Sequence, residues 1–277
     1  MPVALALAAS LIWGAADFVG GTISRSLAAA TVMLWSTLLV FPVLVVVVVV
    51  SGDLVLDGTT VGWGAFAGVA GALGISSLYQ GLATGVMGVV APISSTSVLV
   101  PVLVGVATGD DLAALQVAGV VVAIVGVVLT GGPHLREFRS GGHVPVLWAL
   151  AAALGIGGSL VGLAYGAETS SVSALLVQRV VYVAVLVGVV LAVRAERRPE
   201  RQQVPTLGVL GLGDLSANGL FAVAARSGPL AVVSVVASLY PVATVLLARQ
   251  LQGERLARVQ IAGVVAALIG VSVVVAA

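Results

Sequence analysis

Long apolar runs separated by short polar stretches make up most of this sequence. Splitting the runs at charged and turn residues yields ten segments, which are Val3–Ile23, Ala29–Val50, Val61–Ala83, Val86–Ala107, Ala113–Thr130, Pro145–Tyr165, Val172–Val193, Thr206–Ala225, Pro229–Ala248 and Ala257–Ala276. Each is long enough to cross a bilayer as an α-helix, which takes about 17 to 25 residues. The period-two alternation of a membrane β-barrel is absent from the sequence. The pattern therefore predicts an all-α integral membrane protein with ten transmembrane helices.

The composition supports this prediction and excludes other classes of protein. Of the 277 residues, 60% are hydrophobic and 8% are charged, whereas soluble domains carry about 25% charged residues. The net charge of +1 excludes a nucleic-acid-binding surface, which needs a large basic excess. The first apolar segment has no positive residue before Arg25 and contains Trp13 and Asp17, so we interpret it as a membrane helix and not as a cleaved signal peptide.

The two halves of the chain repeat each other. Leu99–Val102 recurs as Leu239–Val242, 140 residues later, and several positions of Asp110–Gly126 recur in Glu254–Gly270 at an offset of 144. Each half contains five predicted crossings, and this odd number means that the second half enters the membrane in the opposite orientation. We therefore predict two inverted five-helix repeats, a construction common in secondary transporters.

The loop arginines predict the orientation of the chain in the membrane. Ten of them fall on one side, and Arg226 alone falls on the other. The ten are Arg25, Arg136, Arg139, Arg194, Arg197, Arg198, Arg201, Arg249, Arg255 and Arg258. Since arginine-rich loops stay in the cytoplasm, the pattern places this side in the cytoplasm and both termini outside.

Short motifs spread over the whole chain are typical of one family. They are Trp13-Gly14 followed by Phe18, Ala91–Ser95 leading to Pro101, Ser238–Val242, and Gly253–Leu256 followed by Gln260 and Gly263. With these motifs the chain resembles the EamA-like ten-helix proteins of the drug/metabolite transporter superfamily. It departs from them at Ser36, where the family often has Arg, and at Asp110-Asp111 in place of Gly-Glu.

The resemblance implies a fold and a function. It implies EamA-like repeats over residues 1–132 and 144–277, joined by a connecting loop over residues 133–143. It also implies a multi-pass carrier of the cytoplasmic membrane that moves a small polar metabolite, such as an amino acid or a related solute, by alternating access in the direction of export. A passive channel or a lipid scramblase-like protein is the alternative. Related proteins are often drawn with both termini inside, contrary to the arginine pattern.

Three charged residues lie well inside the predicted spans: Asp17, Arg179 and Asp214. Each would cost at least about 2.5 to 3.5 kcal/mol facing lipid, so we expect them to face the interior of the bundle. Arg179 and Asp214 lie near mid-depth. They either form a static ion pair between the seventh and eighth helices, or they line a solute path in which Arg179 binds an anionic group. Asp17 is the candidate for carrying a coupling proton, or is a helix-end residue that reaches the interface.

Serine and proline occupy equivalent positions in the fourth and ninth segments. Ser94 precedes Pro101, and Ser234 precedes Pro241. A proline bends a membrane helix and frees a backbone carbonyl one turn back. We interpret the two segments as discontinuous helices with the serines lining a solute site at mid-membrane. The alternative is that the serines bond to their own helices.

Four further residues are candidates for contact with the solute. Trp13 and Tyr240 lie near mid-depth and not at the membrane interfaces, so they either stack on a solute or simply pack. Asn218 and Gln178 either hydrogen-bond a solute or bond to neighbouring helices.

The remaining patterns concern architecture and chemistry. Gly158, Gly162 and Gly166 form a stripe along the sixth helix that allows another helix to approach closely. The fifth and tenth helices are almost without polar residues, so we expect them to face lipid or a second copy in a homodimer. The two histidines, His134 and His143, lie in one loop without a cluster of carboxylates at ligand spacing. The sequence thus predicts no enzyme, no metal and no cofactor.

Overall fold

The computed structural model of the protein describes residues 1–24, 26–84, 90, 93–131, 143–192, 198–252 and 256–277. In these ranges the chain forms helices and no strand. The helices are α1 (Pro2–Ile23), α2 (Ala29–Ser51), α3 (Gly58–Thr84), η1 (Thr96–Val98), α5 (Leu99–Ala107), α6 (Ala114–Thr130), α7 (His143–Gly166), α8 (Ser171–Ala192), α9 (Val204–Ser227), α10 (Leu230–Ala237), α11 (Tyr240–Gln252) and α12 (Arg258–Ala276). The predicted all-α class is confirmed.

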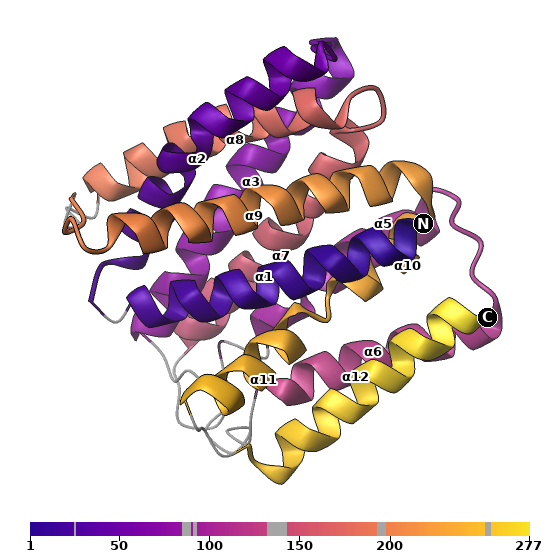
Figure 1. The fold of residues 1–277 in the computed structure, drawn as a ribbon. Coiled ribbons are helices and arrows are strands. Elements are labelled where there is room, and N and C mark those ends of the chain that lie inside the picture. The colour runs from indigo at the N-terminus through magenta and orange to yellow at the C-terminus, as the bar shows by residue number, and fades with distance from the viewer. Residues whose placement is uncertain (25, 85–89, 91–92, 132–142, 193–197, 253–255) are drawn as a thin grey trace.

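The helices account for ten membrane crossings. In the described ranges, eight stretches are long and apolar enough to span a bilayer, and one of them, Leu230–Leu251, joins α10 and α11. Two shorter apolar helices, Ile93–Ala107 and Ala114–Thr130, supply the other two crossings. Valine-rich runs such as Val45–Val50 are helical, because in hydrocarbon each segment must satisfy its own backbone hydrogen bonds. The N- and C-termini lie at the same end of the bundle (Figure 1).

The contacts between helices have the two-fold pattern that inverted repeats predict. In this pattern α1, α2, α3 and α6 correspond to α7, α8, α9 and α12, and η1 with α5 corresponds to α10 with α11. The packing of α3 on α7 is matched by that of α9 on α1, and the packing of α3 on α8 by that of α9 on α2. The helices η1 and α5 contact α7 as α10 and α11 contact α1. The two repeats therefore interlock, and each of these contacts has a counterpart.

Glycines allow the closest of these approaches. The stripe of Gly158, Gly162 and Gly166 lies against α3, as predicted: a Cβ atom added to Gly162 would stand 2.9 Å from the carbonyl oxygen of Trp63. A Cβ atom on Gly126 of α6 would stand 2.7 Å from the Cα atom of Ala267 on α12. Such spacing lets helix backbones touch without intervening side chains.

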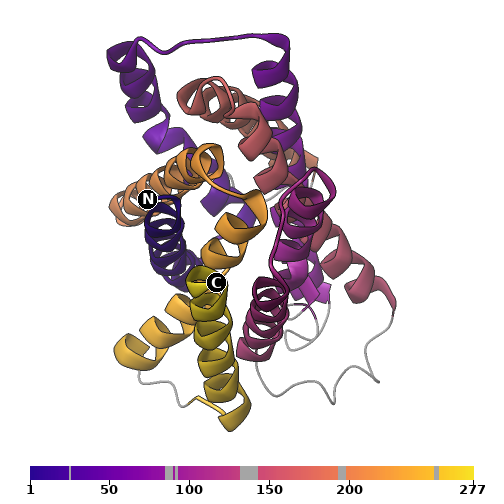
Figure 2. The same ribbon diagram turned by 90° about the vertical axis from the view of Figure 1, so that its right-hand side faces the viewer.

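The helices α6 and α12 form a pair at the edge of the bundle, side by side in Figure 2. Gln116 Oε1 accepts a hydrogen bond from the N–H of Ala113 (3.0 Å), while its Nε2 donates to the carbonyl of Val274 near the end of α12 (3.4 Å). Gln260 makes the equivalent bonds at the other end of the pair, at 3.0 and 3.3 Å. These reciprocal bonds fix the antiparallel register. A homodimer through these helices stays a prediction.

Candidate functional site at mid-membrane

The fourth and ninth crossings are interrupted at equivalent places. The 3₁₀ turn η1 precedes α5, and Ser238-Leu239 separates α10 from α11. Each interruption lies just before a proline, Pro101 or Pro241. Because proline has no N–H to give to the carbonyl one turn back, it ends the regular hydrogen-bond pattern there. The structure thus has the two symmetric interruptions that the prolines predict.

Each interruption rests on a glycine of the other repeat. Gly14 of α1 lies against the carbonyl of Tyr240, and a Cβ atom on Gly14 would stand 2.7 Å from that oxygen. Gly157 of α7 lies in the same way against the carbonyl of Ser97. Gly14 and Gly157 are 143 positions apart in the sequence, at equivalent places in the two repeats. The interrupted helices are therefore held by matched backbone contacts with α1 and α7.

An ion pair joins α8 to α9 near mid-depth. Arg179 Nη2 lies 2.7 Å from Asp214 Oδ2, and the side chains are 5% and 31% exposed. The guanidinium carbon of Arg179 also lies 5.6 Å from the ring centre of Tyr182, within the range of a cation–π interaction. Arg179 is eight residues from the start of α8, about 12 Å along the helix. The two charges therefore satisfy each other inside the bundle.

Asn218 extends this group by one turn of α9. Its Nδ2 donates to the backbone carbonyl of Asp214 at 2.8 Å and to Asp214 Oδ1 at 3.1 Å. Both carboxylate oxygens of Asp214 thus have a donor, Arg179 on one side and Asn218 on the other. The structure brings together three of the residues that the sequence singled out.

The inner face of α1 changes from buried to exposed along its length. Ala6, Ser10, Trp13 and Asp17 follow one another at helical spacing. Ala6 and Ser10 are fully buried, Trp13 is half-buried and Asp17 is exposed. The bundle is therefore closed around the first half of α1 and accessible near its end, at the level of Asp17.

The Asp17 carboxylate interacts electrostatically with residues of three other helices. They are Asp214 of α9, Tyr79 of α3 and Tyr240 of α11. This places Asp17 toward the interior of the bundle and not toward lipid. Within the described ranges, no cation forms an ion pair with it.

Aromatic rings adjoin Asp17 on one side. Trp13, one turn before it, packs edge-on to Tyr240, with ring centres 6.4 Å apart and planes at 71°. Trp13 also contacts the ring of Phe221, with ring centres 5.9 Å apart. Trp13 and Tyr240 therefore lie together, beside the acidic residue and at the interruption of the ninth crossing.

The other predicted residues lie apart from this group. Gln178 is buried, and its Nε2 approaches Ser159 Oγ of α7 at 3.4 Å, which corresponds to a contact between helices. Ser94 and Ser234 are both buried before their interruptions. In the described part of the chain the hydroxyl of Ser234 has no hydrogen-bond partner.

Sequence reasoning missed two residues of the site, Tyr79 and Tyr182. Tyr182 follows Arg179 by three positions, and this helical spacing could have identified it. Tyr79 interacts electrostatically with Asp17 and Asp214. Its place depends on how α3 packs, and no local sequence pattern reveals that.

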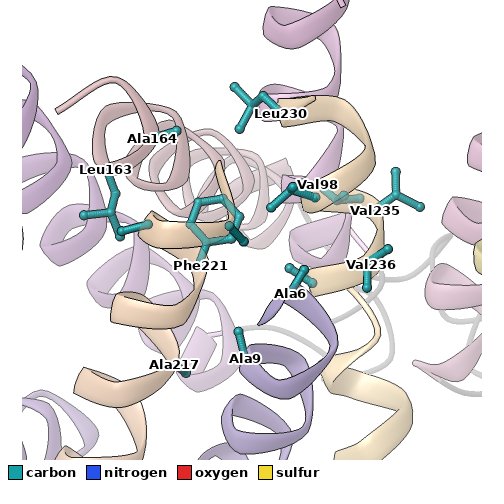
Figure 3. Close-up of a cluster of buried hydrophobic side chains, with 14 of the residues drawn as sticks. Ala6, Ala9, Val98, Leu163, Ala164, Ala217, Phe221, Leu230, Val235 and Val236 are labelled. Atoms are coloured by element: carbon teal, nitrogen blue, oxygen red, sulfur yellow. The ribbon is translucent and has the colours of Figure 1, made fainter. Parts of the chain in front are cut away.

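Apolar side chains close the bundle between the site and the end that carries the termini. Figure 3 shows Phe221 at the centre of this cluster, among side chains that include Ala6, Val98, Leu163 and Val236. Every residue of α10 is buried. We call this cluster the outer seal. Asp17, which lies nearer the arginine-rich end, is exposed, whereas the side chains of the outer seal are buried.

The arrangement agrees with what comparisons with known proteins find. The model of the EamA-like transporter family matches residues 1–132 and 143–276. A solved structure titled "Crystal structure of protein" is similar with a TM-score of 0.81 at 14% sequence identity, over 99% of this chain and 96% of that chain. This likeness shows the fold. No curated protein matches. The residues that the structure describes contain no group of three or more acidic or histidine side chains placed to hold a metal ion.

Proposed function

Because the chain belongs to the EamA-like transporter family, we propose that this multi-pass membrane protein is a secondary carrier. Its solute is a small polar metabolite, such as an amino acid or a related compound. The carrier moves this solute across the cytoplasmic membrane by alternating access. The observation that carries the proposal is a charged group within the membrane-spanning region, exposed at Asp17 and sealed off on one side by the apolar cluster around Phe221.

A sealed end is what distinguishes a carrier from an open channel. A channel needs a continuous path, whereas every residue of α10 is buried and Ala6 and Ser10 have no exposed surface. The pseudo-two-fold symmetry also supports a second state. If the two repeats exchanged conformations, the seal would move to the other end and the site would open to the opposite side.

The accessible end supports export. The interior opens toward the end with most of the loop arginines, which the positive-inside rule places in the cytoplasm. A solute therefore enters from the cytoplasm in this conformation. Release on the other side follows when the outer seal opens.

We assign roles to the predicted residues as follows. Trp13, Tyr240 and Asn218 contact the solute, and Asp17 is the candidate for carrying a coupling proton. Arg179 and Asp214 form the polar wall of the site. Ser94, Ser234 and Gln178 stay predictions, with Gln178 directed toward α7.

The experiment is a binding and uptake assay on the purified protein. Each of the twenty L-amino acids is tested for an increase in thermal stability, since a ligand that binds the folded state stabilises it by mass action. The most stabilising one is then followed into proteoliposomes as a radiolabelled compound. We expect saturable uptake. The double variant Arg179→Gln with Asp214→Asn should reduce this uptake. The control Arg226→Gln, which changes an exposed arginine at the end of α9, should leave it unchanged. Wild-type uptake by the double variant would remove the pair from the site.

A further inference from the structure

We propose that the solute carries a cationic group, an amine or a quaternary ammonium, and that this group binds between the carboxylate of Asp17 and the rings of Trp13 and Tyr240. The inference rests on the proposed carrier function and names its class of solute. It differs from the expectation that Arg179 binds an anionic group.

The charge balance of the site is the first argument. Two carboxylates and one guanidinium lie deep in the membrane-spanning helices, at Asp17, Asp214 and Arg179. Arg179 is taken up by Asp214 at 2.7 Å and is 5% exposed, so it presents no free positive charge to a solute. Within the described ranges, the negative charge of Asp17 has no ion-pair partner. An anionic solute would meet this charge without a cation to offset it.

The second argument is that Asp17 and Arg179 differ in how accessible they are to a solute. Asp17 is exposed while facing the interior, and Arg179 is buried under Tyr182 and Asp214. A solute that enters from the accessible end therefore reaches the carboxylate first. A carboxylate without a counter-charge inside a membrane has a high free energy, and a cationic group of the solute would lower that free energy.

The aromatic side chains are the third argument. Rings at 71° with centres 6.4 Å apart present two differently oriented π-faces beside one carboxylate. A cation within about 6 Å of such a ring centre is attracted by its quadrupole, most strongly over Trp. Trp13 stands one turn before Asp17 on the same face of α1, and Tyr240 interacts electrostatically with Asp17. A carboxylate with two rings is the arrangement that recognises an alkylammonium group with an apolar body.

The test compares three probes that share an aromatic body and differ in charge. They are benzyltrimethylammonium, the neutral benzyl alcohol and the anionic 3-phenylpropionate, each titrated against the full chain in a neutral detergent with thermal unfolding as readout. We expect benzyltrimethylammonium to bind most tightly. Asp17→Asn should weaken its binding about tenfold or more, the loss of about 1.4 kcal/mol of interaction, whereas Asp17→Glu should retain most of it. The matched control is Asp111→Asn, an exposed acidic residue of the loop after α5.

Several results would overturn the inference. These are tighter binding of 3-phenylpropionate than of the cation, wild-type affinity for the cation in Asp17→Asn, or binding of none of the three probes. Asp17→Asn removes no ion pair seen within the described ranges, so its unfolding temperature in the absence of probe shows whether it folds. Failure here is separable from failure of the carrier proposal. Uptake of an amino acid without cation binding would leave the carrier intact, and cation binding without any uptake would leave the site intact.

Discussion

At the scale of single residues, the account depends on where three charges find their partners. The sequence identified Asp17, Arg179 and Asp214, because a charge in a membrane span must face the interior. It left open whether Arg179 meets Asp214 or a solute. The structure pairs them at 2.7 Å and leaves Asp17 exposed. The sequence indicates how deep in the membrane each charged residue lies along its helix. It does not indicate which faces of α8 and α9 meet, because the packing of the whole bundle determines this.

The first prediction concerns this ion pair. Arg179→Gln should lower the free energy of unfolding by about 3 kcal/mol. This value is at the low end of the range for breaking a buried ion pair, because Asp214 is partly exposed. Adding Asp214→Asn should restore most of that loss, since no charge is then left without a partner. Thermal unfolding in detergent measures both, with Arg226→Gln as the control. A double variant less stable than Arg179→Gln alone would show that the pair does not work as a unit.

The second prediction concerns Asp57, which lies before the first turn of α3 outside the membrane. Its carboxylate accepts the N–H of Thr60 at 2.7 Å and the hydroxyl of Thr169 at 3.1 Å. The hydrogen bond from the backbone N–H of Thr60 is the main cause that lowers the pKa of Asp57 below its ordinary value. Because the pKa is lower in the folded state, the stabilisation is complete above about pH 4, the unfolded value, and is lost as the pH falls through the folded value.

Asp57→Asn should therefore be less stable than the wild type at neutral pH, and this difference should shrink in acid. Unfolding measured from neutral to acidic pH checks it, with Asp111→Asn as the control substitution of an exposed acidic residue. A difference that stays constant over the whole range would mean that ionisation of Asp57 does not support α3.

At the scale of the elements, length and hydropathy predicted the helices to within a few residues, except for the start of the fourth segment at Val86, which lies outside the described residues. The prolines predicted the two interruptions. The glycine stripe of α7 predicted the close approach of another helix, which in the structure is α3. Other contacts have no such local signal. The reciprocal bonds of Gln116 and Gln260 between α6 and α12 depend on the register of two segments far apart in the chain.

The third prediction tests the packing of that pair. Gly126→Ala should lower stability by about 1 to 3 kcal/mol, because the new Cβ atom would push against the backbone of α12 and not against a flexible side chain. Gly188→Ala is the matched control within a membrane helix, since nothing lies within 4 Å of its added Cβ atom. The control should be neutral or more stable by up to about 1 kcal/mol. Equal effects at both positions would contradict the close contact.

At the scale of the whole molecule, the sequence predicted two inverted repeats from their offset and their odd number of helices. It did not predict which end is closed. The outer seal combines side chains of several helices, Phe221 and Ala6 among them, and such a cluster exists only once both repeats have folded together.

The fourth prediction locates the closed end. The chain has no cysteine, so single cysteines can be introduced without background. A cysteine at position 17 should react with a membrane-impermeant maleimide added to the arginine-rich face, while a cysteine at position 10, in place of the buried Ser10, should stay unreactive from either face. Faster labelling of position 10 than of position 17 from the face that carries the termini would place the opening at the wrong end.

The most direct test of the central claim, a carrier with a site reached from one side at a time, is solute counterflow in proteoliposomes. Vesicles are loaded with the unlabelled compound that most stabilises the purified protein, and a trace of the same compound in radiolabelled form is added outside. A carrier should give a transient accumulation of label inside the vesicles above its external concentration, because the binding site returns to the outside only with solute bound. Entry that only equilibrates, without an overshoot and without saturation, would contradict it and identify a channel.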